Sequence, residues 1–278
     1  MEVSEIKRRL NDLGLRPSRD RGQNFLLDDR VIEAALDAAG VAAGDRVLEI
    51  GPGLGVLTEA LLSRGASVVA VELDRALADQ LAERIRSDRL EIVVADFLEL
   101  PADQLVERFS SGEYKVVANL PYSISSDALT RLLSVDPRPS GLTLMLQREV
   151  AERICAEPPR TGPLSVLAQV HGEPRIVRIV PPGAFWPPPK VESALLHVGL
   201  RSAEEVRVRL LGLDPESLMS VVRLGFSSRR RQLKNTLSGR FSPELLSAAF
   251  VESGIGPTDR PERLTVDMWI RLVVALTR

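Results

Sequence analysis

The feature that most constrains the fold is an alternation, beginning at residue 45, of short β-branched apolar runs with longer stretches of helical periodicity. Such runs predict buried strands, and helices between strands predict right-handed crossovers and a mostly parallel sheet. Ligand sites of such sheets lie at the carboxyl ends of the strands. The predicted strands are Arg46–Ile50, Ser67–Glu72, Leu90–Ala95, Lys115–Ala118 and Leu142–Leu146.

Two later apolar runs, Arg175–Val180 and Ala194–Leu200, flank a proline-rich stretch and are expected to close the sheet as an antiparallel pair. After Ser202 the strand pattern stops, and glycines and prolines separate four stretches of helical periodicity. These helices are expected at Pro215–Phe226, Arg229–Leu237, Pro243–Ser253 and Val266–Leu276. The sequence therefore predicts an α/β domain over residues 1–204, with a mostly parallel seven-stranded sheet, and a small all-helical domain over residues 205–278.

Composition narrows the class of protein. The single cysteine, Cys155, excludes an internal disulfide framework and a cysteine-rich zinc site, which suits a reducing compartment. His171 and His197 have no third ligand at metal spacing, so we expect no metal and a structural role for both. The chain has no secretory signal and no apolar run of membrane-spanning length. We therefore expect a cytoplasmic protein without a membrane partner.

A glycine-rich turn follows the first predicted strand. Its glycines, at positions 51, 53 and 55, have G-x-G-x-G spacing rather than the G-x-G-x-x-G spacing of dinucleotide sites. Glycines at a strand-to-helix turn let a ligand approach the backbone closely. A tight turn without a ligand is the alternative interpretation.

Carboxylates stand at the ends of the next two strands. Glu72 ends the second strand, near the position where such folds hold ribose hydroxyls. Asp96 follows the third strand and suits a hydrogen bond from an adenine amino group. Each acid alone is equally well explained as a solvated loop residue. Together with the glycine turn, they predict a nucleoside site at this edge of the sheet.

The fourth strand ends in Asn119-Leu120-Pro121-Tyr122, the most informative tetrapeptide of the chain. The Asn119 side-chain oxygen and the Leu120 carbonyl are suited to accept both hydrogens of an adenine amino group, which lets its nitrogen pyramidalise toward a methyl donor. Pro121 fixes the backbone that aims the carbonyl, and Tyr122 offers a face for an extruded base. The alternative is a turn in which Asn119 caps its own backbone.

The chain resembles the ribosomal RNA adenine N6,N6-dimethyltransferases, in particular the bacterial small-subunit members. The resemblance covers nearly the whole chain. Besides the residues above, it rests on Gly22-Gln23-Asn24-Phe25-Leu26, Leu146–Arg153, Gly162–Val166, Phe185–Ser193 and Phe226–Leu237.

This resemblance implies a Rossmann-like class I methyltransferase fold and S-adenosylmethionine as cofactor. By position, it implies that Asn24 and Leu26 contact the methionine end of the cofactor and that Gly51 lies against it. It implies that Glu72 holds the ribose and Asp96 the adenine.

On the substrate side, the resemblance implies that Asn119 contacts both the cofactor and the target amine. It also implies that Phe185 and Tyr122 sandwich the target base. From the residues alone, the proline-rich stretch around Phe185 favours a stiff linker over a rigid loop that presents an aromatic side chain.

The predicted RNA-binding surface is a basic patch inside a nearly neutral chain, whose formal net charge is −2. No acidic residue occurs between Ser217 and Pro243, and such a stretch suits phosphate contacts, although a solvated helix face is the alternative. A weaker amino-terminal cluster is either a disordered arm or part of the RNA footprint. The RNA-binding candidates of the basic patch are Arg223, Arg229, Arg230, Arg231 and Lys234.

The resemblance implies dimethylation of two adjacent adenosines in a 3′-terminal hairpin of small-subunit (16S) ribosomal RNA, with a role in subunit biogenesis. The expected partners are that RNA and the pre-30S particle, and we expect a monomer. Three alternatives stay open: a large-subunit (23S) methylase conferring macrolide resistance, a catalytically silent nucleic-acid-binding factor, and a dehydrogenase. The first shares the catalytic core, whereas the glycine spacing disfavours the last.

Overall fold

The computed structural model describes residues 2–17, 23–109, 112–228 and 231–278. The chain forms two compact units. The sheet unit comprises residues 1–151 and 175–200, and the helical unit comprises residues 152–174 and 201–278. Residues 152–174 therefore belong to the helical unit, whereas the predicted boundary at residue 204 puts them in the first domain. The predicted division into two domains stays a prediction.

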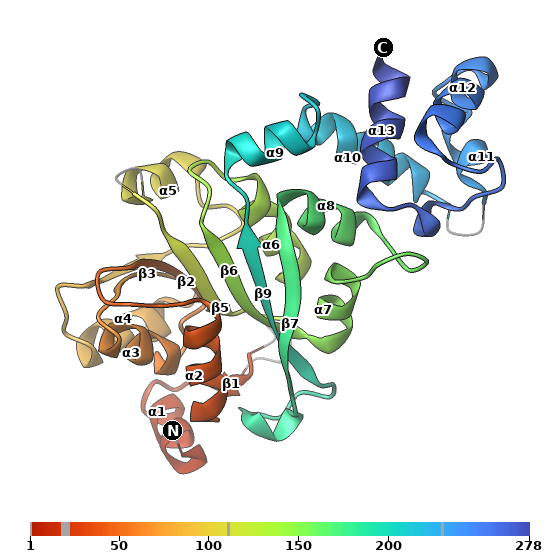
Figure 1. Ribbon diagram of the computed structural model, residues 1–278. Coiled ribbons are helices and arrows are strands. Elements are labelled where there is room, and N and C mark those ends of the chain that lie inside the picture. Colours follow the sequence, from red (N-terminus) through yellow and green to blue (C-terminus); the bar gives the residue numbers. More distant parts are fainter. Residues whose placement is uncertain (1, 18–22, 110–111, 229–230) are drawn as a thin grey trace. The chain divides into compact units, whose positions relative to one another are not determined.

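A seven-stranded sheet forms the centre of the sheet unit, in the order β4-β3-β2-β5-β6-β9-β7 (Figure 1). The neighbours from β4 to β6 run parallel, and β9 runs antiparallel to β6. This confirms the predicted α/β architecture with a mostly parallel seven-stranded sheet. The strands are β2 (Arg46–Ile50), β3 (Ser67–Glu72), β4 (Leu90–Val94), β5 (Lys115–Asn119), β6 (Gly141–Gln147), β7 (Gly172–Val180) and β9 (Ser193–Leu200).

Helices connect these strands and bury one apolar face each. In α2, for example, Val31, Ile32, Ala35 and Leu36 recur at helical spacing and are all buried. Asp28 caps its first turn by accepting from the Arg30 N–H at 2.9 Å. The helices in this part of the chain are α1 (Val3–Asp12), α2 (Asp29–Ala38), α3 (Val56–Ser63), α4 (Arg75–Arg84), α5 (Ala102–Phe109), α6 (Ser125–Ser134) and α7 (Arg148–Ile154).

A second, two-stranded sheet was not predicted. Strand β1 (Phe25–Leu26) pairs antiparallel with β8 (Phe185–Trp186), which follows the short 3-10 helix at Pro182–Ala184. The proline-rich stretch is therefore tied to the amino-terminal segment rather than being a free linker. Two-residue strands carry too little periodicity to be read from sequence, because their pairing is set by partners far along the chain.

Residues 3–12 form helix α1, so the disordered-arm interpretation is wrong for this part of the amino terminus. Ile6 and Leu10 are buried in a cluster with Phe25, Leu54 and Leu77. These contacts give the helix the tertiary packing that a short helix needs for stability.

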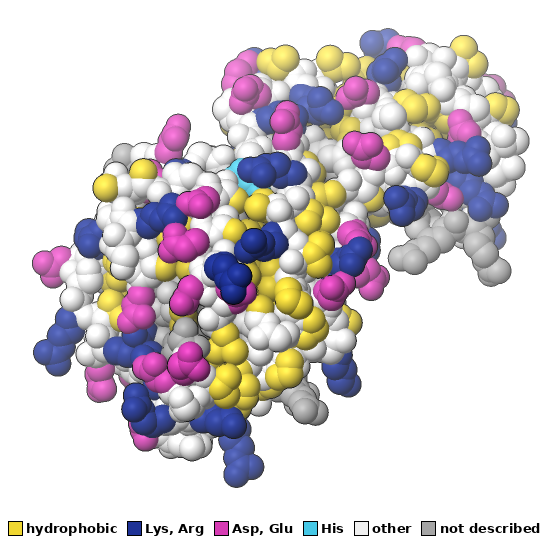
Figure 2. Space-filling view, turned by 60° about the horizontal axis from the view of Figure 1, so that its bottom comes forward, with side chains coloured by type: hydrophobic (Ala, Val, Ile, Leu, Met, Phe, Trp, Pro, Cys, Tyr) yellow, Lys and Arg dark blue, Asp and Glu magenta, His cyan; other side chains and the backbone are white. Residues whose placement is uncertain are grey.

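Charged side chains of both signs are interspersed over the face shown in Figure 2. The figure shows no broad field of one sign there, in keeping with the small net charge. Among the described residues, no helix is both long and apolar enough to cross a bilayer.

The helical unit confirms most of the helices expected after Ser202. The predicted helix Arg229–Leu237 is wrong at Arg231 and Gln232, because α11 begins only at Leu233 and Gln232 is extended, while Arg229 and Arg230 lie outside the described residues. The capping pair Ser202 and Glu205, whose spacing is readable from sequence, begins a helix that the periodicity did not reveal. The helices are α8 (Pro163–His171), α9 (Ala203–Arg209), α10 (Pro215–Gly225), α11 (Leu233–Leu237), α12 (Pro243–Ser253), the 3-10 helix Pro261–Arg263 and α13 (Val266–Thr277).

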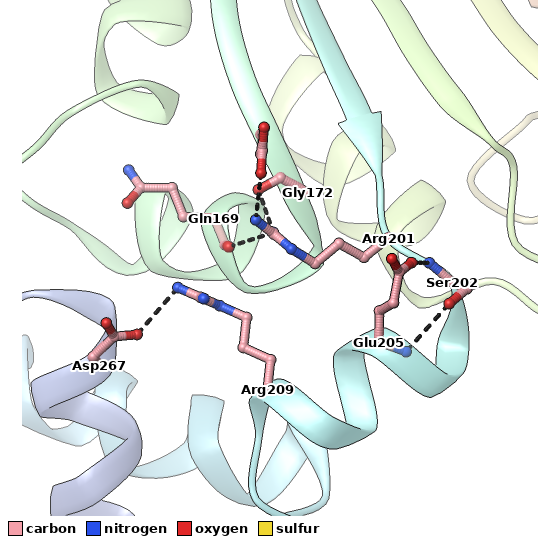
Figure 3. A network of polar contacts seen from close by, with 8 residues as sticks. Gln169, Gly172, Arg201, Ser202, Glu205, Arg209 and Asp267 are labelled. Carbon is pink, nitrogen blue, oxygen red and sulfur yellow. Dashed lines mark hydrogen bonds and ion pairs between the residues drawn. The ribbon is translucent and has the colours of Figure 1, made fainter.

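Arginines bind the elements of the helical unit together (Figure 3). The Arg201 guanidinium donates to the carbonyl oxygens of Gln169 at 3.0 Å and Gly172 at 2.7 Å, at the end of α8. Arg209, at the end of α9, reaches Asp267 of α13 at 3.2 Å. A cation at a helix carboxyl end satisfies carbonyls that have no intrahelical partner.

Candidate functional site

The carboxyl ends of β2, β3 and β5 surround a cavity of about 890 Å³, counted with the space open to solvent. We call it the strand-end cavity. Its lining comprises Gln23, Asn24, Phe25, Leu26, Glu49, Gly51, Pro52, Gly53, Leu54, Val56, Leu57, Glu72, Leu73, Asp74, Leu77, Asn119, Leu120, Pro121 and Tyr122.

The glycine turn forms one wall of this cavity. Gly53 and Gly55 both have left-handed backbone, with φ of +56° and +77°. A Cβ at Gly55 would lie 2.2 Å from the Leu81 side chain and would displace it, and the positive φ itself favours glycine there. The Arg84 Nη2 donates to the Leu54 carbonyl oxygen at 2.6 Å and holds the turn from outside.

Glu72 is buried at the cavity wall, and the backbone orients its carboxylate. Its Oε2 accepts from the Gly53 N–H at 3.0 Å, and its Oε1 accepts from the Asp74 N–H at 2.9 Å. Burial raises the pKa of Glu72, and these two amide donors oppose that rise. Because each carboxylate oxygen has two acceptor positions, both can still accept from ligand hydroxyls.

Glu49 is a site residue that sequence reasoning missed. Its side chain is 1% exposed, lines the cavity, and accepts at Oε2 from the Thr58 hydroxyl at 2.7 Å. Burial, together with the smaller effect of the Glu72 charge, raises the pKa of Glu49 to about 8, against the Thr58 hydrogen bond. The sequence shows an acid between the apolar residues Leu48 and Ile50, but this pattern alone does not tell whether the side chain faces a cavity or solvent.

Asn119 is oriented by the amino-terminal segment. Its Nδ2 donates to the Asn24 carbonyl oxygen at 3.0 Å, across 95 residues of sequence. This contact assigns the nitrogen of the side-chain amide to Asn24 and leaves Oδ1 as an acceptor at the cavity wall. The alternative interpretation expects the Asn119 side chain to cap its own backbone, whereas this contact joins it to a distant segment.

Tyr122 lines the same cavity, half-buried, with its phenol oxygen 2.5 Å from the Ser193 hydroxyl oxygen. Burial raises the pKa of Tyr122, against the hydrogen bond to Ser193. The phenol is therefore neutral near pH 7, since its ordinary pKa is already about 10.

Most of the predicted site residues meet at the strand-end cavity. Of the catalytic and cofactor-binding candidates, all of which are described, Asp96 and Phe185 do not line it. The Asp96 Oδ1 accepts from the Leu98 N–H at 2.8 Å and so caps the turn after β4. The residues brought together are Asn24, Leu26, Gly51, Glu72, Asn119, Leu120, Pro121 and Tyr122.

Phe185 is 2% exposed and packs in the apolar core with Leu26, Val180 and Ala184. The predicted stacking of Phe185 on a base is not built into this arrangement and stays a prediction. Its neighbour Trp186 is half-buried, and the Lys7 ammonium lies 5.8 Å from the centre of its ring.

The basic patch is only partly described, because Arg229 and Arg230 lie outside the described residues. Arg231 is exposed and Lys234 is half-buried. Arg223 forms an ion pair with Glu216, which stands just before the stretch that lacks acids. Arg223 is thus partly neutralised.

Within the described ranges, no group of three or more potential metal ligands occurs. His197 instead shares a hydrogen bond of 2.9 Å with the Thr143 hydroxyl, and burial lowers its pKa.

Sequence comparison assigns most of the chain to one family. Residues 16–278 match a family described as Ribosomal RNA adenine dimethylase. A relative from Anaeromyxobacter dehalogenans, named Ribosomal RNA small subunit methyltransferase A, is 42% identical and covers 96% of each chain. A relative of the same name from Cutibacterium acnes is 37% identical, covering 100% of this chain and 95% of its own.

Solved structures show the same fold. The crystal structure of the 23S rRNA methyltransferase ErmE superposes with a TM-score of 0.71 at 28% identity, covering 92% of this chain and all of its own. A dimethyladenosine transferase from Plasmodium falciparum superposes with a TM-score of 0.72 at 22% identity, covering 89% and 95%.

Proposed function

This chain belongs to the ribosomal RNA adenine dimethylase family, and from that we propose that it methylates N6 of two adjacent adenosines in the 3′-terminal hairpin of small-subunit (16S) ribosomal RNA. It is an S-adenosylmethionine-dependent rRNA adenine dimethyltransferase. We choose the small subunit because the chain is 42% identical to a small-subunit methyltransferase over 96% of both chains. A role in small-subunit biogenesis is part of this proposal.

The strand-end cavity fits S-adenosylmethionine. The buried Glu72 carboxylate, held by two backbone amides, suits the two ribose hydroxyls, and the glycine turn admits close approach of a ligand to the backbone. Asn24, Leu26 and Gly51 would hold the rest of the cofactor, and the contact of Asp96 with the adenine stays a proposal because this residue does not line the cavity. The bound cofactor supplies an activated methyl group on a sulfonium, so no protein nucleophile is needed.

Asn119 and Leu120 act on the target amine. The adenine N6 lone pair is delocalised into the ring, and hydrogen bonds from both N6 hydrogens to the Asn119 Oδ1 and the Leu120 carbonyl favour the pyramidal nitrogen of the transition state. Pro121 aims that carbonyl, and Tyr122 supplies a stacking surface for the base.

The test of substrate choice uses undermethylated small subunits, large subunits and duplex DNA, each incubated with the protein and methyl-labelled cofactor. We expect label on two adjacent adenosines of small-subunit RNA. The competing substrate is large-subunit RNA, because the 23S rRNA methyltransferase ErmE is 28% identical and covers 92% of this chain. Label confined to large-subunit RNA or DNA would overturn the proposal.

Replacing Glu72 by alanine should weaken cofactor binding by about ten- to a hundredfold, because ribose hydroxyls left unpaired cost roughly 1–3 kcal/mol. Titration calorimetry with S-adenosylmethionine measures this. Glu72→Gln, which keeps the side-chain volume, should lose less. Wild-type affinity in a folded Glu72→Ala protein would contradict the assigned role.

Changing Arg229, Arg230 and Arg231 together to glutamate should weaken binding to small subunits and spare cofactor binding. The slope of log affinity against log salt should become shallower by about one for each phosphate that the variant no longer neutralises. Arg86→Glu, an exposed reversal in the sheet unit, is the control for the effect of one charge reversal away from the stretch. A folded triple variant with wild-type affinity and salt slope would show that the stretch is solvated and does not contact the RNA.

We further propose that the protein acts as a cytoplasmic monomer, without a membrane or metal partner, on the pre-30S particle. Co-sedimentation with immature and with mature small subunits tests which particle the protein binds. Sedimentation equilibrium tests whether the protein is a monomer. Preference for mature subunits, or a stable dimer, would contradict this part.

A further inference from the structure

We propose that the Ser193 hydroxyl is a positioning group for methyl transfer, which holds the Tyr122 ring at the cavity wall in the orientation on which the target adenine stacks. The inference deepens the proposed function and rests on it for the stacking role of Tyr122. Ser193 itself does not line the strand-end cavity, so it acts through Tyr122.

The two residues come from strands that are not neighbours. Tyr122 follows β5, Ser193 begins β9, and β6 lies between these strands in the sheet. Ser193 is 0% exposed and stands opposite Gln147 of β6 in the antiparallel register. Its hydroxyl is therefore a rigid anchor, and its 2.5 Å contact with the phenol reaches over the end of β6.

The Tyr122 ring needs such an anchor because its backbone alone does not fix it. The Ser125 hydroxyl and the Ile124 N–H both donate to the Pro121 carbonyl oxygen, at 3.2 and 3.1 Å, and so hold the turn before α6. These bonds hold the backbone and leave the two side-chain torsions of Tyr122 unrestrained by them, and the ring is only half-buried. The hydrogen bond to Ser193 restrains both torsions from the far end of the ring.

The phenol has no other evident chemical task. Burial raises the pKa of Tyr122, so it stays protonated at neutral pH and is a poor base for the proton lost from N6. Orientation of the ring is the role that the contact supports, because misplacing a reactant by about 1 Å can cost on the order of a hundredfold in rate.

The kinetic test compares Ser193→Ala, Tyr122→Phe and the double variant on undermethylated small subunits. We expect each single variant to lower kcat by about ten- to a hundredfold, with cofactor affinity unchanged, and the double variant to be no worse than either. The control, Thr143→Val, removes another buried hydroxyl of the sheet unit, which is bonded to His197. Wild-type kcat in Ser193→Ala, or additive losses in the double variant, would overturn the inference.

A second measurement does not depend on activity. The chain has two tyrosines, so ring-labelled tyrosine gives two NMR signals, and Tyr114 is the internal reference. In Ser193→Ala the chemical shift of the Tyr122 ring should move toward the value averaged over the orientations of a mobile ring. The chemical shift of the Tyr114 ring should not change. If this occurs but the wild type methylates no small subunits, the proposed function is wrong and the anchoring stands. An unchanged Tyr122 signal overturns the inference whatever the activity.

Discussion

Asn119→Ala should lower kcat for methyl transfer by about a hundred- to a thousandfold, the loss typical of removing one preorganised hydrogen-bonding group from a transition state. Cofactor affinity should change little, because the acceptor that is removed acts mainly on the target amine as its nitrogen becomes pyramidal. Single-turnover transfer to undermethylated small subunits, with calorimetry of cofactor binding, measures both quantities.

A second variant separates the two functions of the Asn119 amide. Asn119→Asp keeps an acceptor oxygen but loses the 3.0 Å donation to the Asn24 carbonyl. If the acceptor oxygen contributes most to catalysis, Asn119→Asp should retain more activity than Asn119→Ala. If the hydrogen bond to Asn24 contributes most, the two variants should be equally inactive. Undiminished kcat in Asn119→Ala, or a loss that higher cofactor concentration restores, would refute the catalytic role.

Glu49→Gln should stabilise the cofactor-free protein, increasingly so as the pH rises from about 4.5 to about 8. Burial raises the pKa of this carboxyl to about 8 from its ordinary 4.5. Between these values the unfolded chain releases the proton and the folded chain retains it. Stability therefore falls as the pH rises through this window, and the penalty is fully present above pH 8.

The size of the effect follows from the same shift. A change from 4.5 to about 8 corresponds to about 4–5 kcal/mol at high pH. Glutamine keeps the Thr58 hydrogen bond and carries no charge, so it avoids this cost. Melting temperatures of the two proteins should coincide near pH 4.5 and differ by roughly 10 °C at pH 9.

An exposed substitution, Glu99→Gln, is the control for the loss of one carboxylate, and its difference from wild type should stay flat across this range. A difference between Glu49→Gln and wild type that does not grow with pH would show that Glu49 is already ionised in the folded protein.

Local chemistry made much of the site predictable. The glycine turn, Glu72 and Asn119-Leu120-Pro121-Tyr122 each follow a predicted parallel strand, and parallel strands bring their carboxyl ends to one edge of the sheet. Those residues therefore had to meet if the strands were correct. Glu49 was missed because an acid inside a strand gives no local sign of whether it faces a cavity or solvent.

Tertiary pairing placed the residues that the sequence could not. Phe185 is flanked by prolines and looks like an exposed loop residue, yet β8 pairs with β1 and buries its ring. Asp96 follows a strand in the same way as Glu72, but its carboxylate turns back to cap the Leu98 N–H. A side chain at a strand end has several local partners, and sequence alone does not choose among them.

By itself, the sequence determined the seven strands of the main sheet, its mostly parallel character and the family, because periodicity, turn residues and contiguous motifs are local properties of the chain. Only the tertiary structure decided which way the Asn119 amide faces, which hydroxyl holds Tyr122 and that Glu49 is buried at the cavity wall. Each of these depends on a partner brought near by the packing of distant segments: Asn24 lies 95 residues from Asn119, and Ser193 lies 71 residues from Tyr122. Such pairings arise from burial of the strands against one another, so no local pattern encodes them.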